Sequence, residues 1–345
     1  MLEVKGYAAF DSKGPLAPFK VPRREPGERD VVIDVLFCGV CHSDLHQVRN
    51  EWAGSTYPLV PGHEIVGRVA RVGSKVTRFH EGETVGVGCF VGSCGHCDAC
   101  KRGLEQYCDQ AVGTYNSLES DRKTPTYGGY STRMVVNEHF VLRVAAKERL
   151  EAVAPLLCAG ITTWSPLRHW KVGKGHRVAV LGLGGLGHMA VKLASAFGAE
   201  VTLLSSSPGK KADAQRLGAT DFLLGKDQAK ARGRFDFIID TVSAAHDLVA
   251  LTSLLKLDGT LVLLGAPSEP AQVPAFALIP KRRSIAGSLV GGIAETQEML
   301  DFCAAHGITA DVETIPMQQI DRAYDRMLKG DVRYRFSIDL ASLNR

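Results

Sequence analysis

The sequence predicts an α/β protein in two parts, a β-rich N-terminal part and a doubly wound parallel sheet that follows it. Three observations predict this fold class. Before Leu150, short strand-like runs are separated by Gly, Pro and Asp turns. Between residues 177 and 264, apolar runs alternate with helix-length segments, and a glycine-rich turn follows the first of these runs. A chain of 345 residues is long enough for about two domains, each with its own core.

The N-terminal part shows the pattern of a barrel or a sandwich. Residues 31–36 and 134–136 are short runs rich in β-branched side chains. Residues 67–73 alternate polar and apolar side chains between two glycines, as a half-exposed strand does. Many short strands in a glycine-rich unit are typical of these two architectures.

The rest of the chain shows a βαβ pattern and then a mixed one. We expect strands over 177–181, 201–204, 222–224, 235–240 and 261–264, with helices over 186–197 and 210–217. After these we expect helices over 295–305 and 320–328 and strands over 312–315 and 335–340. In the simplest topology the last segment returns to the first domain, so we expect domain boundaries at 1–152, 153–289 and 290–345.

Composition narrows the class of protein. Hydrophobic content of 45% and charged content of 23% are typical of a soluble globular protein. A net charge of +4 without clustered basic residues gives no support to a nucleic-acid or membrane partner. The N-terminus lacks a secretory signal and no run approaches 18 apolar residues, so we expect a cytoplasmic protein. Its nine cysteines are then reduced, and they are buried, catalytic or metal-binding.

A glycine-rich turn predicts a dinucleotide site. Gly182, Gly184 and Gly187 form a G-x-G-x-x-G motif after a predicted strand and before a predicted helix. The first permits a tight turn, the second lets the backbone approach a pyrophosphate, and the third lets helix and strand pack closely. With Gly185 and Leu186 between them, the turn offers free N–H groups to phosphates. The alternative is a plain strand-to-helix turn.

The residues that follow favour NADP(H) over NAD(H). Proteins that bind NAD carry an Asp or Glu about 20 residues further on, which bonds the ribose 2′-hydroxyl. Here that place holds no carboxylate, and Ser205, Ser206 and Lys210 can hold a 2′-phosphate instead. The same segment is also consistent with a helix start, with Ser207 as its cap and Pro208 at its first position.

Four closely spaced cysteines predict a structural metal site. Cys94, Cys97, Cys100 and Cys108 follow the pattern C-x2-C-x2-C-x7-C, which can close a tetrahedral zinc site. Because the protein fills all four positions, such a site has no place for a substrate. Iron–sulfur clusters also use closely spaced cysteines and remain an alternative.

A second set of residues can form a catalytic metal site. Two thiols, Cys41 and Cys158, and the imidazole of His63 match the pattern of three protein ligands with an open fourth position. That position would hold water or a substrate oxygen. These ligands are far apart in the sequence, so their spacing does not show that they meet. The alternative is that Cys41 is a buried thiol among ordinary polar residues.

These motifs resemble the zinc-containing medium-chain alcohol dehydrogenases, and the resemblance covers essentially the whole chain. Gly62-His63-Glu64-x2-Gly67-x5-Gly73-x2-Val76 matches the zinc signature of that family. Within the family, four segments resemble the cinnamyl alcohol dehydrogenase group: G-V-C-H-S-D-L-H over 39–46, the four-cysteine lobe, C-A-G-I-T over 158–162 and G-L-G-G-L-G-H over 182–188.

The resemblance implies a GroES-like β-barrel catalytic domain, a Rossmann domain and two zinc ions. It implies that Cys41, His63 and Cys158 bind the catalytic zinc. Glu64 would be either an alternate ligand or a residue that contacts the ligands without binding the metal. The four clustered cysteines would bind the structural zinc. Ser43 and His46 match the proton-relay positions, where the group often has Thr in place of Ser43. An ordinary helix histidine is the alternative for His46.

The resemblance also implies cofactor contacts and a dimer. His42 would approach the cofactor phosphates, and Thr162 matches the position on the nicotinamide side. Ser205, Ser206 and Lys210 match the group's contacts to the NADP phosphate. Asp44 reads as a local helix-start residue. Family members are commonly dimers joined through edge strands of the Rossmann sheet, here residues 284–290.

The implied activity is the NADP(H)-linked interconversion of primary alcohols and aldehydes. Trp52, Tyr115 and Trp164 can line an apolar pocket for aromatic or medium-chain substrates, or each can be a core aromatic. Three alternatives remain. One is an NAD(H)-linked polyol or secondary-alcohol dehydrogenase of the same family, another a zinc-free quinone reductase of this fold. The third is a non-catalytic protein that binds zinc and a nucleotide.

Overall fold

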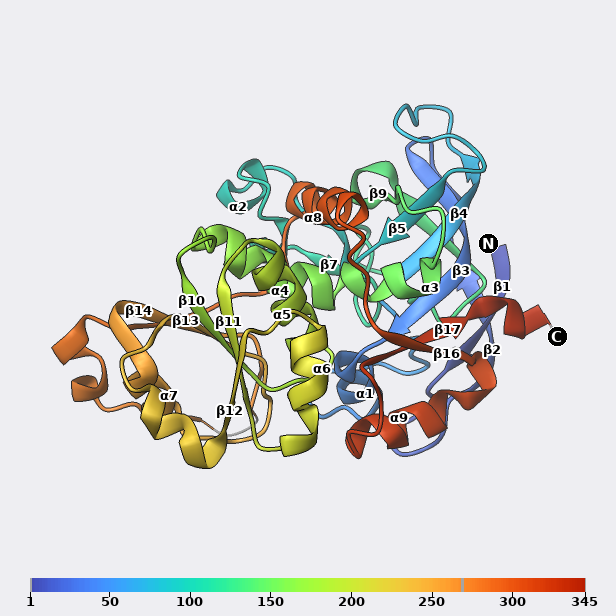
Figure 1. The fold of residues 1–345 in the computed structure, drawn as a ribbon. Helices are drawn as coiled ribbons and strands as arrows, with labels where there is room; N and C mark the ends of the chain where they lie inside the picture. Colours follow the sequence, from blue (N-terminus) through green and yellow to red (C-terminus); the bar gives the residue numbers. More distant parts are fainter. Residues whose placement is uncertain (1, 268–269, 345) are drawn as a thin grey trace. The chain divides into compact units, whose positions relative to one another are not determined.

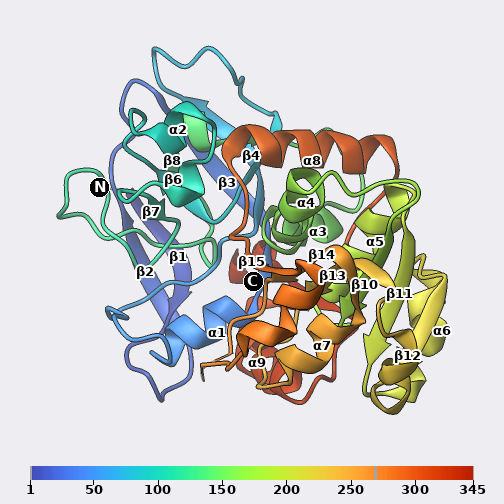
Figure 2. The same cartoon turned by 90° about the vertical axis from the view of Figure 1, so that its left-hand side faces the viewer.

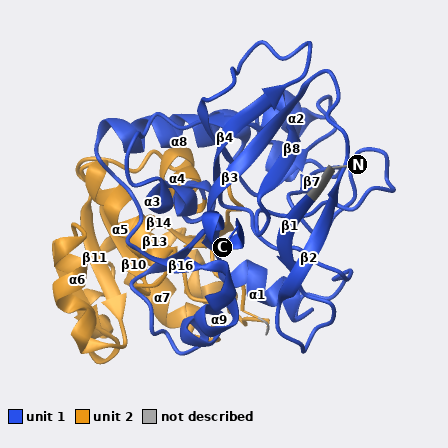
Figure 3. Cartoon of the chain, turned by 90° about the vertical axis from the view of Figure 1, so that its right-hand side faces the viewer, with its two compact units in different colours: residues 1–161, 291–345 blue, residues 162–290 orange. Residues whose placement is uncertain are grey.

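The computed structural model describes residues 2–267 and 270–344. The chain divides into two compact units, Met1–Ile161 with Gly291–Arg345 and Thr162–Val290 (Figure 3). The first boundary therefore lies nine residues beyond the expected one, and the second lies one residue beyond it. The shift at the first boundary has a physical reason: helix α3 (Leu150–Val153) and the 3-10 turn Ala154–Leu157 contact β3 of the first unit.

The first unit is built on a seven-stranded sheet, in the order β16-β17-β3-β4-β5-β9, with β8 paired to β3. Its strands are β3 (Asp30–Val40), β4 (Ile65–Val72), β5 (Thr84–Val87), β8 (Arg133–Asn137), β9 (Leu142–Arg143), β16 (Val312–Pro316) and β17 (Arg335–Asp339). Two small sheets pair β1 (Leu2–Ala8) with β2 (Ala17–Arg23) and β6 (Phe90–Gly92) with β7 (Val112–Gly113). This agrees with the β-rich N-terminal part that the sequence predicts.

Strand β3 carries the core of this unit and leads into the site. Its residues Val31, Val32 and Ile33 are buried, and the strand pairs antiparallel with β4, β8 and β17. At its end, Phe336 of β17 pairs with Val40, so the next residue pair along the two strands brings Arg335 to Cys41. Helix α1 (His42–Val48) starts directly after Cys41.

Three further helices complete the first unit. Helix α2 (Asp98–Lys101) belongs to the cysteine lobe, α8 (Ile293–Ala305) begins beside that lobe, and α9 (Ile320–Leu328) precedes β17 (Figures 1 and 2). The Glu105 carboxylate of the lobe accepts a hydrogen bond of 3.1 Å from the backbone N–H of Ile293. The cysteine lobe thus fixes the start of α8.

The second unit is a six-stranded parallel sheet in the order β12-β11-β10-β13-β14-β15 (Figure 1). Its strands are β10 (Arg177–Leu181), β11 (Glu200–Ser205), β12 (Asp221–Leu224), β13 (Phe235–Asp240), β14 (Leu255–Leu263) and β15 (Ser284–Gly287). Its helices are α5 (Gly187–Ala196), α6 (Lys211–Arg216) and α7 (Leu248–Leu254), and α4 (Ala159–His169) spans the boundary between the units.

The strand order of this sheet reverses between β10 and β13. From β10 the chain moves outward to β11 and β12, and then returns to β13 on the other side. Right-handed crossovers therefore place α5 and α6 on one face and α7 on the other, which makes the sheet doubly wound. The carboxyl ends of β10, β11 and β13 meet at this reversal, where α/β sheets bind ligands. The predicted fold class is confirmed.

No single helix among the described residues is long and apolar enough to cross a membrane. One pair, Leu150–Leu157 and Ala159–His169, meets the length and composition criteria only when joined across a bend of 53°, and most of its residues are buried.

Candidate active site and dinucleotide site

The structure brings Cys41, His63, Glu64 and Cys158 together. One ligand atom of each residue lies within 4.8 Å of the others, and all four residues are buried. The Cys41 and Cys158 sulfurs are 4.0 Å apart. Two thiols, an imidazole and a carboxylate at these distances form a donor set that zinc prefers. The cluster is entirely within the first unit.

Local backbone geometry positions the two middle ligands. His63 and Glu64 precede β4, and Gly62 before them has φ +104°, which favours glycine. A Cβ atom on Gly62 would lie 2.7 Å from the Cys38 sulfur and 2.7 Å from the Tyr130 ring. A larger residue at this position would therefore displace the turn that holds His63.

Asp44 has a larger role than the helix start that the sequence suggests. Its carboxylate is fully buried and accepts hydrogen bonds from the backbone N–H groups of Cys41 (2.9 Å) and Gly62 (3.1 Å). His63 Nδ1 also lies 3.1 Å from this carboxylate. With Nδ1 as the donor, Nε2 of His63 is left free to bind a metal, a common arrangement behind metal-bound histidines. In the sequence, the position of Asp44 three residues after Cys41 indicates only a helix cap.

Arg335 is a site residue that the sequence analysis missed. Its side chain is 5% exposed, and its guanidinium contacts the Glu64 carboxylate and lies 3.9 Å from the Cys41 sulfur. A hydrogen bond from Cys158 lowers the pKa of Cys41 well below its ordinary value, and the Arg335 cation lowers it further against the effect of burial. The only signal in the sequence is an arginine within a closing strand, where its neighbours Tyr334 and Phe336 are apolar.

Glu64 has one oxygen that faces no donor. Burial raises the pKa of its carboxyl to about 7, although the Arg335 cation opposes this rise. Among the described residues, Oε2 of Glu64 has no hydrogen-bond partner while Oε1 contacts Arg335. A buried acceptor without a donor is costly. A cation within this cluster would satisfy that oxygen, so the residues present fit a zinc ion.

The four cysteines of the lobe also converge. Sulfurs of Cys94, Cys97, Cys100 and Cys108 lie within 4.8 Å of one another. Backbone N–H groups of His96 and Cys97 donate to the Cys94 sulfur at 3.5 and 3.3 Å, and they lower the pKa of this thiol to about 6. Thiolates held by backbone donors in a short loop suit a structural zinc ion.

The predicted relay residues lie on helix α1. The Ser43 hydroxyl is 3.5 Å from the Cys41 sulfur, which places it at the edge of the cluster. His46 is half-buried; its Nδ1 is 2.5 Å from the Glu51 carboxylate, and its ring stacks on Trp52 with centroids 4.9 Å apart. His42, the first residue of the helix, is exposed.

The three aromatic residues that we considered for the pocket have different environments. Tyr115 lies against His63, with ring centroids 5.8 Å apart, and is therefore beside the cluster. Trp52 is 48% exposed and packs on His46. Trp164 is 1% exposed and packs edge-on against Phe197 in the second unit. For Trp164 the pocket interpretation is wrong, because the side chain fills the core.

The dinucleotide motif has the expected local geometry. Gly182 follows β10 with φ +87°, and α5 begins at Gly187. A Cβ atom on Gly187 would lie 2.1 Å from the carbonyl oxygen of Gly182, so only glycine fits. Gly184, Gly185 and Leu186 complete the turn between them. Thr162 is buried in α4, four residues after Cys158.

A cavity of about 620 Å³ in the second unit opens at the reversal of the sheet. Gly182, Gly184, Ser205, Ser206 and Lys210 line it together. The Lys210 ammonium donates to the carbonyl oxygen of Leu183 at 2.8 Å, which holds it beside the glycine-rich turn. The predicted phosphate ligands and the predicted pyrophosphate turn therefore share one cavity.

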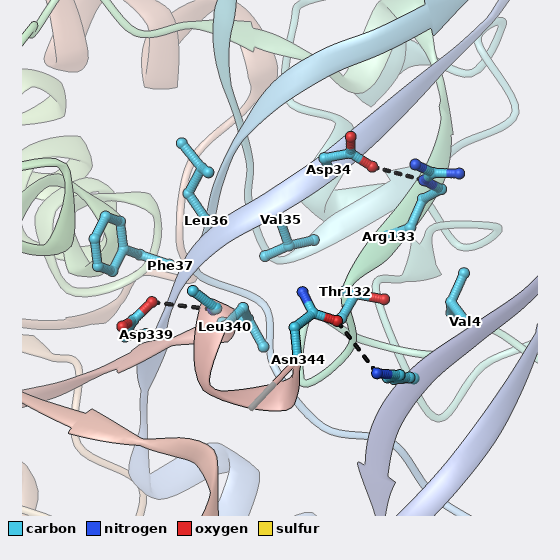
Figure 4. A pocket seen from close by; sticks show the side chains of 12 residues that line it. Val4, Asp34, Val35, Leu36, Phe37, Thr132, Arg133, Asp339, Leu340 and Asn344 are labelled. Carbon is cyan, nitrogen blue, oxygen red and sulfur yellow. Dashed lines mark hydrogen bonds and ion pairs between the residues drawn. The ribbon is translucent and has the colours of Figure 1, made fainter.

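Another cavity, of about 530 Å³, lies in the first unit between β1, β3, β8 and the C-terminal turn (Figure 4). Its Arg133 guanidinium bonds Asp34 at 2.6 Å, and its Lys5 ammonium lies 3.5 Å from the Asn344 side chain. It contains none of the predicted site residues.

Comparisons with known proteins agree with this geometry. Residues 27–146 match the alcohol dehydrogenase GroES-like domain and residues 185–305 match the zinc-binding dehydrogenase family. The chain is 56% identical to aldehyde reductase YahK of Escherichia coli over 99% of both chains. It is 55% identical to NADP-dependent alcohol dehydrogenase C 1 of Mycolicibacterium smegmatis, again over 99% of both.

A solved structure is also similar to this chain over nearly its whole length. A cinnamyl alcohol dehydrogenase from Sorghum bicolor superposes with a TM-score of 0.96 at 48% identity, over 99% of this chain and 98% of the other. The catalytic unit is therefore GroES-like, and the parallel sheet is of the Rossmann type. This protein belongs to the zinc-binding medium-chain alcohol dehydrogenase family and is similar to its cinnamyl alcohol dehydrogenase group.

Proposed function

We propose that this protein is a zinc-dependent, NADP(H)-linked alcohol dehydrogenase that reduces aldehydes to primary alcohols and catalyses the reverse reaction. The observation that carries the proposal is the buried cluster of Cys41, His63, Glu64 and Cys158 in a chain of this family. A zinc ion bound there supplies electrostatic stabilisation of the negative charge that develops on the substrate oxygen. NADPH supplies the hydride.

The residues around the cluster have separate roles in this proposal. Cys41 and Cys158 bind as thiolates, and Asp44 orients His63 through Nδ1. Arg335 neutralises Glu64, so the cluster does not hold an excess of negative charge. The cysteine lobe binds a second zinc ion and supports the start of α8 through Glu105.

In this proposal the Ser43 hydroxyl passes a proton to the reacting oxygen. It lies at the edge of the cluster, 3.5 Å from the Cys41 sulfur. His46 then exchanges that proton with solvent, which suits a half-exposed imidazole bonded to Glu51. His42 approaches the cofactor phosphates from the same helix, and Thr162 contacts the nicotinamide.

The second unit favours NADP(H). Ser205, Ser206 and Lys210 line the nucleotide cavity at the end of β11, where residues 204–211 include no Asp or Glu. The relative from Mycolicibacterium smegmatis is named an NADP-dependent enzyme. Lys210 and the two hydroxyls would bind the 2′-phosphate.

The substrate is an aromatic or medium-chain aldehyde in this proposal. The Tyr115 ring beside His63 gives the cluster an apolar neighbour, and the similar Sorghum bicolor enzyme is named for cinnamyl alcohol. Trp52, on the exposed side of His46, is the other aromatic residue of this region.

The decisive experiment measures metal content and NADPH oxidation together. We expect two zinc ions per chain by mass spectrometry, one for each cluster. We expect NADPH absorbance to fall with cinnamaldehyde or benzaldehyde, and the rate to be lost after chelation and restored by zinc. An enzyme that turns over none of a panel of aldehydes, or that prefers NADH, would contradict the proposal. Turnover of mannitol with NAD would support the polyol alternative.

We also propose a homodimer that forms through the edge of the Rossmann sheet. Strand β15 is the last strand in the order, and Phe276 (81% exposed) and Ile279 (64% exposed) precede it. Exposed edge strands with apolar neighbours are templates for pairing. Light scattering should give twice the chain mass, and Phe276→Glu with Ile279→Glu should give the monomer.

We also propose a cytoplasmic location, because the two cysteine clusters require reduced thiols.

A further inference from the structure

An imidazole–carboxylate pair stands on the wall of the nucleotide cavity and has no role in the proposal above. His246 lines the same cavity as Gly182, Ser205 and Lys210. It follows β13, whereas Ser205 ends β11, and these strands flank β10 on its two sides. The imidazole and the phosphate-binding group therefore lie on two walls of one cavity, with the glycine-rich turn between them.

Asp240 makes the position of this imidazole rigid. It is the last residue of β13 and is buried, and one carboxylate oxygen accepts the backbone N–H of Val242 at 3.0 Å. The other oxygen lies 2.7 Å from His246 Nε2. The main-chain carbonyl of Asp240 accepts the N–H groups of Leu264 (2.9 Å) and Gly265 (3.1 Å), which ties it to the neighbouring strand end.

Both ring nitrogens of His246 are occupied within the protein. Nδ1 lies 2.8 Å from the carbonyl oxygen of Ala244, which can only accept, so Nδ1 donates. Nε2 is bonded to the Asp240 carboxyl. The ring therefore has no nitrogen left for a hydrogen bond to a ligand. It offers the cavity a flat face and its carbon edge.

Most residues that line the cavity near His246 are apolar: Val242, Ala245, Ala250 and Leu251. The two polar ones, Thr241 and Asp247, are bonded within the protein, since the Thr241 hydroxyl donates to the carbonyl oxygen of Leu181 and the Asp247 carboxylate accepts the N–H groups of Val249 and Ala250. The His246 ring is flat, both of its nitrogens already have hydrogen-bond partners in the protein, and most side chains around it are apolar. Such a surface suits the face of a heteroaromatic base. It does not suit a phosphate, which requires donors.

We propose that His246, held by Asp240, is a binding residue for the adenine ring of the cofactor and packs against its face. This rests on the proposed dinucleotide function of the cavity and assigns its two walls, one to the base and one to the 2′-phosphate. The adenine is common to NADPH and NADH, so His246 contributes to the affinity of both and does not select between them.

The test compares His246→Ala, His246→Phe and the matched control Lys210→Ala. Affinities of the zinc-loaded enzyme for NADPH, NADH and 5′-AMP are measured by fluorescence titration, and melting temperatures check the fold. We expect His246→Ala to weaken all three ligands by one common factor of about tenfold, the scale of base–aromatic stacking. His246→Phe keeps a flat ring and should restore most of the affinity for each ligand.

Lys210→Ala should weaken NADPH and leave NADH and 5′-AMP nearly unchanged. If His246→Ala leaves 5′-AMP affinity unchanged, or weakens NADPH alone, the adenine role is overturned. If Lys210→Ala does not change the ratio of NADPH to NADH affinity, the proposed phosphate site fails instead. The two failures are therefore distinguishable in one set of titrations.

Discussion

Replacement of Arg335 by methionine should destabilise the protein by leaving Glu64 buried without its cation. The Arg335 side chain is 5% exposed and the Glu64 side chain is fully buried, so water cannot compensate for the loss. Removal of one partner of such a pair typically costs about 3–5 kcal/mol. Methionine has a similar length and fits the strand, so the cost comes mainly from the charge.

The effect should depend on pH. The pKa of Glu64 is about 7 in the folded protein, above its ordinary value of 4.5, because burial outweighs the Arg335 cation. A raised carboxyl pKa means that the fold loses stability as pH rises from about 4.5 to about 7. Arg335→Met raises this pKa further, and each further unit costs about 1.4 kcal/mol at high pH. The difference in the free energy of unfolding between Arg335→Met and wild type should therefore be small at pH 5 and largest near pH 8.

The assay is urea unfolding of wild type, Arg335→Met and the double variant Arg335→Met/Glu64→Gln at both pH values. The double variant also removes the buried Glu64 carboxylate, so its free energy of unfolding should return most of the way to that of wild type. The matched control is Arg133→Met, whose partner Asp34 is 48% exposed and whose loss should cost about 0–1 kcal/mol. A cost below about 1 kcal/mol for Arg335→Met, or no recovery in the double variant, would refute this reasoning.

Four further outcomes follow from the site geometry. Lys210→Ala should raise the KM for NADPH about tenfold and leave that for NADH nearly unchanged in steady-state assays; equal changes would contradict a 2′-phosphate contact. Asp44→Asn should weaken zinc binding about 10-fold to 100-fold, measured by competition with a chelator, and full affinity would show that Asp44 does not orient His63. Cys94→Ser should halve the zinc content and lower the melting temperature, because metal binding is coupled to folding, whereas an unchanged melting temperature would argue against a structural site. His46→Ala should lower kcat across the range from about pH 6 to 9, because the relay loses its link to solvent, and an intact kcat would leave His46 as an ordinary helix residue.

Local sequence patterns determined the elements of this protein and its local sites. Apolar runs that alternate with helix-length segments located β10, β11 and β13, because the strands of a parallel sheet are buried on both faces. The glycine-rich turn and the four-cysteine lobe are each complete within about 15 residues of chain. A short loop holds its residues close together in any fold, so their spacing already describes a site.

Tertiary structure alone decided which distant residues meet. Cys41, His63 and Cys158 converge because β3, the turn before β4 and the segment after α3 pack in one unit. Arg335 reaches the cluster through the register that pairs Phe336 with Val40, and no local pattern encodes that register. The burial of Trp164 against Phe197 likewise depends on packing between separate elements of the second unit. Spacing along the chain describes chemistry within one loop, whereas the charge balance of a buried site is set by side chains that only the folded sheet brings to it.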